Sequence, residues 1–319
     1  MIICVTLNAA MDKTLEVPSF TPGRRHRTVD QTTMPGGKGV NIARAIKRLG
    51  QPVIATGFAG GPTGNRIVEA LNDESILNDF VRISDESRTN TAVLDPTTGL
   101  QTEINERGPA ISAGELELFR EKLLYLAQGA SICVFAGSLP RAVETDIYFS
   151  LIREVRRLGV TTMIDTDGEP LRLSMRAEPD LVSPNELEAE ELVGHEFNDA
   201  DDRTQAVVEM TRLGAHEAIM TVSDGCYARI YDGGAPVLYR VRIAEQEARS
   251  AVGSGDAFLA GYVAARYSDR DPAECLRFGV ACGAESTLHF GAGILDAARV
   301  DRLLAEVEAE RLQVGAQIG

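Results

Sequence analysis

The sequence contains no tryptophan, and only 5% of its 319 residues are aromatic. A buried core must therefore be built mainly from Val, Ile, Leu and Ala, and a hydrophobic content of 44% is enough for a sizeable one. Long apolar runs are also missing, since no stretch approaches the roughly 18 residues of a membrane span. The short apolar N-terminus lacks the basic flank of a signal peptide. We expect a cytoplasmic protein with no membrane partner.

Positive charge is scarce, because 32 Lys and Arg stand against 47 Asp and Glu, for a net charge of −15. Such a surface repels nucleic acid, so we expect no nucleic-acid partner. Any phosphate site must be a local basic pocket. The five cysteines form no C-x-x-C pair, and the four histidines show no metal spacing. Reduced, buried thiols are expected.

Short apolar runs alternate with amphipathic segments along the chain. Strands that are apolar on both faces and alternate with helices are typical of a parallel sheet that is covered on both sides. The sequence therefore predicts an α/β fold with a doubly wound, mainly parallel sheet flanked by helices. Ligands bind such sheets beyond the carboxyl ends of the strands. The strands are expected at 2–7, 53–57, 132–135, 161–165, 180–182 and 218–222, and the helices at 40–49, 64–71, 115–126, 146–158, 186–192, 204–213, 257–267 and 273–288.

Two stretches break this pattern. Residues 13–34 alternate as strands do, and 91–105 read as a hairpin with a turn at 96–99. They predict a small β-sheet lid outside the main sheet, formed by about 12–35 and 88–107. No low-complexity linker interrupts the chain, so 1–319 is expected to be a single domain.

A glycine-rich string precedes the predicted helix at 257–267. Gly253 and Gly255 bracket Ser254, and Asp256 follows at the helix start. Glycines allow backbone N–H groups to turn toward one point, and a helix N-terminus adds partial positive charge, which together favour an anion hole. Asp256 could then accept a proton from a hydroxyl. The string alone is equally compatible with an aspartate that only caps its helix.

A second glycine-rich string, from 35 to 44, also leads into a helix. Gly36, Gly37 and Gly39 surround Lys38, and Asn41 lies in the first turn. The glycines allow close approach to a ligand, to which Lys38 adds a cation. The string is not a Walker A loop, whose glycine spacing and Ser or Thr are missing. The alternative is a tight turn with a solvated lysine.

Other polar residues follow predicted strands. Asn185 and Glu188 lie three apart at a helix start, where they could orient water around magnesium, or simply favour the helix dipole. Ser138 lies in a turn of small residues at a strand end. Arg88, at the base of the hairpin, could clamp a phosphate or be solvated. Arg24 begins a basic run that is either an edge-strand guard or part of a phosphate pocket.

The motifs occur along the chain in this order: Asn8 to Asp12, Gly36 to Asn41, Arg88 to Asn90, Thr102 to Asn105 with Gly108-Pro109, Gly137 to Pro140, Pro184-Asn185 and Gly253 to Asp256. This order resembles the phosphofructokinase-B family of the ribokinase-like superfamily. The resemblance covers the chain from Thr6 to about Thr287. It looks closest to the fructose-1-phosphate kinase and tagatose-6-phosphate kinase branch, because of Thr-Leu-Asn-Ala-Ala-Met-Asp at the start, Gly-Gly-Lys-Gly, and Glu-Ile-Asn-Glu-Arg-Gly-Pro.

The resemblance implies a ribokinase-like sheet with a lid that joins two subunits in a homodimer. It implies an ATP- and magnesium-dependent kinase that transfers the γ-phosphoryl group to a primary hydroxyl of a ketohexose phosphate, first of all fructose 1-phosphate. The implied catalytic residues are Asp256 as base and Gly253, Ser254 and Gly255 as anion hole. The implied substrate contacts are Asp12, Arg24, Gly37, Lys38, Asn41, Arg88 and Ser138. The implied nucleotide contacts are Asn185, Thr221, Ser223 and Gly225, and Glu188 would hold magnesium through water.

The sequence departs from the family on the nucleotide side. Ala251 replaces a usual Thr, Ser254 a usual Ala, Ser183 a frequent Lys, and Val222 a glycine of the nucleotide loop. Alternatives are a tagatose-6-phosphate kinase, a free-sugar or nucleoside kinase of the same fold, or a ligand-binding protein that kept the fold. The basic residues near the lid argue against free sugars. No G-x-G-x-x-G follows the first strand, which argues against a dinucleotide-binding oxidoreductase.

Overall fold

A computed structural model describes residues 1–244, 246 and 248–312. Its large sheet has β1 (Ile2–Thr6) near the centre, where all five residues are buried. The sheet is parallel from β12 to β5, with β6 also parallel to β4, and so the predicted doubly wound parallel sheet is confirmed. The parallel strands, in spatial order, are β12 (Glu217–Val222), β11 (Leu181–Val182), β10 (Thr161–Asp165), β9 (Ile132–Ala136), β1, β4 (Val53–Gly60), β5 (Leu77–Asn78) and, also beside β4, β6 (Val81–Ile83).

An antiparallel extension follows β12 at one edge of the sheet. Its strands are β13 (Gly225–Asp232), β14 (Ala235–Arg242) and β15 (Glu308–Leu312). The sequence patterns did not predict these strands. Their hairpin turns at Gly233 and Gly234, both with positive φ, where glycine is the favoured residue.

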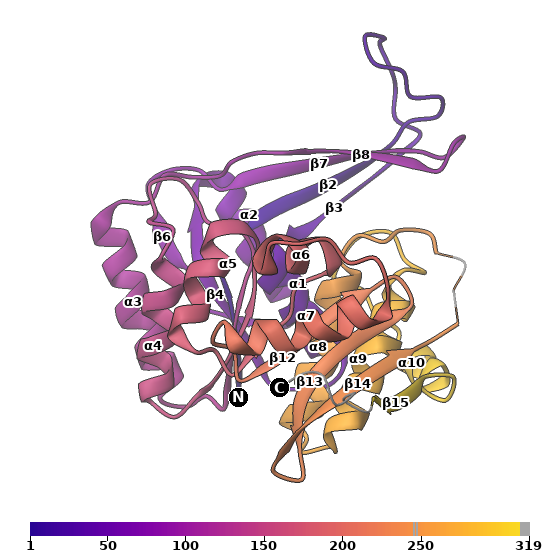
Figure 1. Cartoon of the computed structure of the whole chain (residues 1–319). Coiled ribbons are helices and arrows are strands. Elements are labelled where there is room, and N and C mark those ends of the chain that lie inside the picture. The colour runs from indigo at the N-terminus through magenta and orange to yellow at the C-terminus, as the bar shows by residue number, and fades with distance from the viewer. Residues whose placement is uncertain (245, 247, 313–319) are drawn as a thin grey trace.

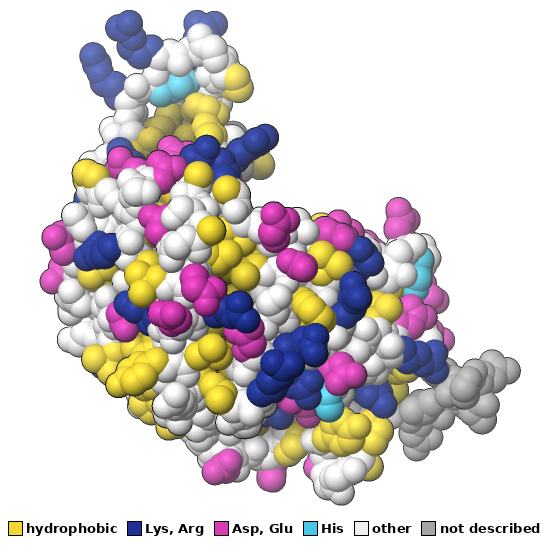
Figure 2. All heavy atoms as spheres, turned by 90° about the vertical axis from the view of Figure 1, so that its left-hand side faces the viewer, with side chains coloured by type: hydrophobic (Ala, Val, Ile, Leu, Met, Phe, Trp, Pro, Cys, Tyr) yellow, Lys and Arg dark blue, Asp and Glu magenta, His cyan; other side chains and the backbone are white. Residues whose placement is uncertain are grey.

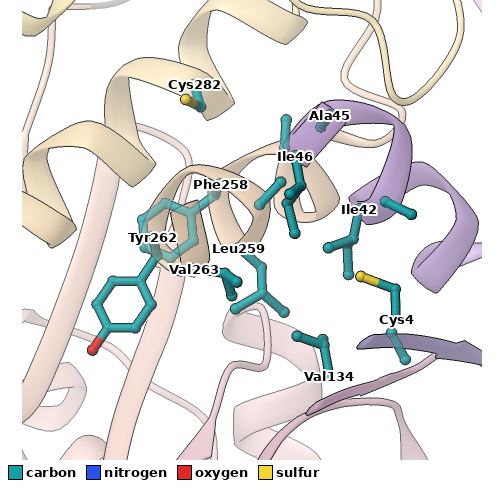
Figure 3. Packing of buried hydrophobic residues seen from close by; sticks show 14 of the residues in the cluster. Cys4, Ile42, Ala45, Ile46, Val134, Phe258, Leu259, Tyr262, Val263 and Cys282 are labelled. Carbon is teal, nitrogen blue, oxygen red and sulfur yellow. The ribbon is translucent and has the colours of Figure 1, made fainter. Parts of the chain in front are cut away.

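Helices cover both faces of the sheet, and each covered face holds a separate core (Figure 1). On one face α1 packs against α8, with Ile42 and Ile46 lying near Leu259 and Val263 (Figure 3). The helices of this face are α1 (Lys38–Arg48), α2 (Gly61–Asp73), α8 (Ser254–Tyr267), α9 (Pro272–Ser286) and α10 (Ala297–Leu304). Those of the other face are α3 (Ala113–Ala127), α4 (Ile147–Arg157), α5 (Gly168–Ser174) with a 3-10 turn (Met175–Ala177), α6 (Glu186–Val193) and α7 (Ala200–Arg212).

A small four-stranded sheet stands off the main body (Figure 1). Its spatial order is β3 (Asp30–Gly36), β2 (Ala10–Glu16), β7 (Arg88–Asp95) and β8 (Leu100–Asn105), which we call the small sheet. A separate small sheet was predicted from these stretches and is confirmed. A loop between β2 and β3 projects from it, and basic side chains gather at the tip of this projection (Figure 2).

All five cysteines are buried and unpaired, as predicted. Among the helices of the described residues, none combines the length and the apolar character needed to cross a membrane.

Candidate active site

Asp256 lies in the first turn of α8 but does not cap it. The helix begins after its N-cap residue, Gly253, which has a left-handed φ of 78°. A glycine has no side chain, so this helix start has no side-chain cap. The carboxylate of Asp256 instead accepts a hydrogen bond from Nδ2 of Asn41, at 2.8 Å, across the interface of α1 and α8. The alternative of a merely capping aspartate is therefore wrong.

The turn before α8 leaves donors free for an anion. The N–H of Ser254 donates to the carbonyl of Ala251 at 3.2 Å. Within the described part of the chain, the next two N–H groups, of Gly255 and Asp256, have no protein acceptor. Unpaired N–H groups at a helix N-terminus bind anions. Of the three predicted anion-hole residues, Ser254 has a paired N–H, whereas the N–H groups of Gly253 and Gly255 make no hydrogen bond to the described residues.

Burial raises the pKa of Asp256 to about 7, because the side chain is almost completely enclosed. The negative charge of Asp165 acts in the same direction, while Lys38 and the Asn41 hydrogen bond oppose it. A carboxyl group with such a pKa is suited to general base catalysis near neutral pH.

Lys38 lies among three carboxylates at the start of α1. Its Nζ lies 2.7 Å from Oδ1 of Asp165 and 3.2 Å from Oε1 of Glu188. Burial works to lower the pKa of Lys38, but the charges of Asp165, Glu188 and Asp256 outweigh burial and hold this pKa above its ordinary value. The alternative of a solvated lysine is therefore wrong.

Asp165 is a site residue that the sequence motifs did not reveal. It ends β10 and is almost fully buried. The rule that ligands bind at the carboxyl ends of parallel strands could have drawn attention to it.

Asp12 and Arg88 lie side by side where the small sheet meets the main body, since Ala10 pairs with Arg88 and Asp12 with Asn90. Nδ2 of Asn90 donates to Asp12 at 2.9 Å. Arg88 donates from Nε to the carbonyl of Asn8, at 3.1 Å, and is partly buried. Burial raises the pKa of Asp12, which Arg88 and the Asn90 bond oppose.

Several buried amide oxygens near these residues have no partner. Nδ2 of Asn8 donates to the hydroxyl of Ser138 at 3.3 Å, but its Oδ1 accepts nothing from the described residues. The same holds for Oδ1 of Asn41 and of Asn90. Buried polar groups are usually satisfied. These three oxygens therefore fit a ligand rich in hydroxyl donors.

A cavity of about 460 Å³ adjoins the start of α8 on its other side. All four predicted nucleotide positions line it, together with Ser254 and Gly255, while much of the remaining wall is apolar. The predicted nucleotide positions are Asn185, Thr221, Ser223 and Gly225, and the apolar side chains include Val222, Ile243, Phe258 and Val280.

Two of these positions also have structural roles. Asn185 caps α6, and its side chain and that of Glu188 form a reciprocal capping box. Gly225 has a φ of 142°, and a Cβ there would fall 2.0 Å from the carbonyl oxygen of Val241. A glycine at 225 is thus required by the approach of β13 to β14.

No group of three or more metal-binding side chains occurs among the described residues. Magnesium often keeps several waters and takes only one or two protein carboxylates beside substrate phosphates. Asp165 and Glu188 share one cation here, the ammonium of Lys38, and they lie at the end of β10 and the capped start of α6. Their oxygens suit a hydrated magnesium ion.

Arg24 is not brought to this site within one chain. It is exposed in the loop between β2 and β3, and its backbone N–H donates to Thr21 at 3.3 Å. The other predicted substrate residues lie where the small sheet meets the carboxyl edge of the main sheet. They are Asp12, Gly37, Lys38, Asn41, Arg88 and Ser138.

The sequence matches the model of the pfkB family carbohydrate kinases over residues 2–298. It is 32% identical to the 1-phosphofructokinase of Borreliella burgdorferi, over 97% of this chain and 98% of that protein. The structure is similar to phosphofructokinase-2 of Escherichia coli in complex with substrates and products (TM-score 0.88, 28% identity, 96% of this chain and 98% of that one); a tetrameric inhibited form of that enzyme is also known. Ribokinase of Arabidopsis thaliana, complexed with ribose and ATP, shares the fold (TM-score 0.73, 24% identity, 95% and 98%).

Proposed function

This chain belongs to the pfkB family of carbohydrate kinases, and we propose that within the family it is an ATP-dependent 1-phosphofructokinase. It is a phosphotransferase that acts on sugar phosphates, so the alternative of a ligand-binding protein without activity is set aside. Fructose 1-phosphate is favoured as acceptor by the 32% identity to a 1-phosphofructokinase over nearly the whole chain.

The observation that carries the proposal is the position of Asp256. Its buried carboxylate accepts a hydrogen bond from Asn41 on the side of the small sheet, and the two residues before it, Ser254 and Gly255, line the cavity. In the proposed reaction, Asp256 accepts the proton of the C6 hydroxyl of fructose 1-phosphate. The hydroxyl oxygen bonds to the γ-phosphorus, and the bond to the leaving ADP breaks. The proton then passes from Asp256 to solvent.

The transferred group carries negative charge throughout, so catalysis depends on placing positive charge and N–H donors around it. The N–H groups of Gly255 and Asp256 and the ammonium of Lys38 would supply both. Asp12, Gly37, Asn41 and Ser138 would orient the sugar hydroxyls.

Arg88 would bind the phosphate that the sugar already carries. Its guanidinium stays protonated, because an arginine remains charged even when burial lowers its pKa.

The nucleotide would occupy the cavity lined by Asn185, Thr221, Ser223 and Gly225. Asp165 and Glu188 would hold magnesium through water, and the ion would supply charge neutralisation of the phosphates. Lys38 is free to pair with a phosphate when these carboxylates take another cation.

We further propose that 1–319 is one domain and that the small sheet is its lid, which closes over the sugar and excludes water. The lid would also join two chains in a homodimer. Such a dimer gives Arg24 a role that it cannot have in its own chain, since its loop projects away from the body and could reach a partner's sugar (Figure 1).

A substrate panel tests the proposal. Fructose 1-phosphate, tagatose 6-phosphate, fructose 6-phosphate, fructose and a nucleoside are each assayed with ATP and magnesium. We expect kcat/KM to be at least tenfold higher for fructose 1-phosphate than for any other acceptor. A preference for another phosphorylated ketohexose would overturn the acceptor, and a preference for an unphosphorylated one would also overturn the role of Arg88.

A further inference from the structure

Arg44 is an almost completely buried arginine of α1 that none of the preceding roles uses. Its Nε and Nη2 pair with the carboxylate of Glu74 at 2.8–3.0 Å. Its Nη1 donates to the carbonyl of Ala292 at 2.7 Å and approaches the carbonyl of Pro35 at 3.4 Å. One guanidinium thus touches three segments that are far apart in the sequence.

The segment that contains Ala292 supports the anion hole. A Cβ on Gly253 would fall 2.4 Å from Cβ of Ala292, so the two residues are in direct contact. A Cβ on Gly293 would fall 3.1 Å from Cβ and Nη1 of Arg44. The position of the turn before α8 therefore depends on where Arg44 holds residues 292–293.

The strand that contains Pro35 is an edge strand of the small sheet, and it ends beside the proposed sugar site. Pro35 lies in β3 and is followed by Gly36, on which a Cβ would fall 1.9 Å from the carboxylate of Asp12. Burial raises the pKa of Asp12, and the charge of Arg44 is among the influences that oppose this rise. The same guanidinium thus contacts a neighbour of the sugar-side carboxylate.

A second contact joins the same two segments. A Cβ on Gly291 would fall 2.5 Å from Cε of Met34, the residue before Pro35. Met34 also lies within 3.6 Å of Nη1 of Arg44, through its sulfur. The end of β3 and residues 291–293 therefore form one packed unit around the arginine.

From this geometry we infer that Arg44 is a positioning residue that couples the lid strand β3 to the anion hole before α8. The inference rests on the proposed kinase function. When sugar phosphate binds, it orders β3 and Asp12. The guanidinium then holds residues 291–293 in position, and these hold Gly253 and the N–H groups that follow it. Arg44 is not among the residues proposed to bind either substrate, so it would act through its neighbours.

The chain offers a matched control for this role. Arg48 lies one turn further along α1 and also pairs with Glu74, at 3.8 Å, but it is more exposed and has no hydrogen bond to residues 34–36 or 291–293 among the described contacts. Lysine keeps the charge but lacks the planar fork that lets Arg44 bond in several directions. The variants to compare are therefore Arg44→Lys and Arg48→Lys.

Binding of a non-hydrolysable ATP analogue, AMP-PNP with magnesium, is measured by calorimetry with and without saturating fructose 1-phosphate. In the wild-type protein and in Arg48→Lys, we expect the sugar phosphate to tighten analogue binding at least fivefold, since coupled sites affect each other reciprocally. In Arg44→Lys, this factor falls below two and kcat falls at least tenfold, while the affinity for each ligand alone changes less than threefold. An unchanged coupling factor in Arg44→Lys, or none in the wild type, overturns the inference.

Hydrogen exchange of the unliganded protein tests the same inference without any assumption about substrate. We expect Arg44→Lys to speed exchange in peptides from 30–36, 288–296 and 250–257 together, while Arg48→Lys leaves all three unchanged. Faster exchange only around Glu74 and α2 would show a purely structural arginine and overturn the inference. Failure of wild-type turnover on fructose 1-phosphate would instead count against the proposed function.

Discussion

At the scale of single residues, the proposed chemistry depends on the protonation of the Asp256 carboxyl group. Burial and the nearby Asp165 disfavour the carboxylate, while Lys38 and Asn41 favour it. The balance leaves a pKa of about 7, so the group can both accept a proton and release it near neutral pH.

This balance predicts a pH profile. The value of kcat/KM should fall as the pH drops below about 7, because a protonated Asp256 cannot accept the hydroxyl proton. Asn41→Ala removes a hydrogen bond that favours the carboxylate, so the midpoint of this fall should move to higher pH. Steady-state kinetics between pH 5.5 and 9 would measure it. The phosphate of the substrate titrates equally with both proteins, so only the difference between their midpoints counts, and an unchanged or lower midpoint would refute the assignment.

Asp165, a residue of the candidate site that lies outside every quoted motif, shows why such balances are hard to predict. Asp165 is a single polar residue at the end of an apolar strand. Its importance comes from Lys38, which lies 127 residues earlier. The pairing of Arg44 with Glu74 was equally hard to predict. A buried arginine on an amphipathic helix cannot be told from an exposed one by its local sequence. Only the packing of β3 and residues 291–293 around it reveals the difference.

At the scale of secondary structure elements, two glycines at the start of α8 that look equivalent in the sequence have different conformations. Gly253 has a left-handed φ and lies against Ala292, whereas Gly255 is inside the helix, where an added Cβ would have no neighbour within 4 Å. The glycine-rich string alone assigns both the same role.

This difference predicts opposite effects on stability. Gly253→Ala should destabilise the protein by about 1–3 kcal/mol, because alanine is strained at positive φ and would clash with Ala292. Gly255→Ala should be neutral or stabilising by up to about 1 kcal/mol, because alanine is the better helix former. Urea unfolding of the two variants would measure the free energies of unfolding. Equal effects would show that the turn is not shaped as described.

Most elements were predictable because their patterns are local. The parallel strands are short apolar runs, and the helices between them are amphipathic and end at glycines such as Gly50 and Gly159, both with positive φ. The antiparallel strands β13 to β15 were not predicted. They carry Arg229, Arg240 and Arg242, and their strand character comes from pairing at the sheet edge more than from local apolar alternation.

At the scale of the whole molecule, the small sheet has apolar side chains that are exposed to solvent in a single chain and therefore do not stabilise it by burial. Leu100 and Ile104 of β8 are 69% and 63% exposed, and Val29 beside β3 is 66% exposed. Exposed apolar groups on a sheet that stands off the body are typical of an interface. They support the proposed lid-to-lid homodimer.

Sedimentation equilibrium would test this assembly. We expect the native mass to be twice the 34.4 kDa of one chain, and Ile104→Lys to reduce it to one chain by placing a charge in the interface. Leu118 is a half-exposed residue of α3, outside the small sheet, and Leu118→Lys should leave the mass unchanged. A wild-type mass of one chain, or an Ile104→Lys protein that assembles as the wild type does, would contradict the lid interface.

The variant Asp256→Asn tests whether Asp256 is the base of a sugar-phosphate kinase. Asparagine keeps the shape and can still accept from Asn41, but it cannot take a proton. We predict that kcat with fructose 1-phosphate and ATP falls at least a thousandfold.

The variant should remain folded, and its stability has a definite sign. The folded-state pKa of about 7 lies above the ordinary 3.8, so the contribution of Asp256 to the free energy of unfolding is lost as the pH rises from about 4 to 7. At pH 8 the variant should therefore unfold at the same or a higher temperature than the wild type. Its gain in the free energy of unfolding should not exceed about 4 kcal/mol. Turnover of a well-folded Asp256→Asn protein within tenfold of the wild type would contradict the account.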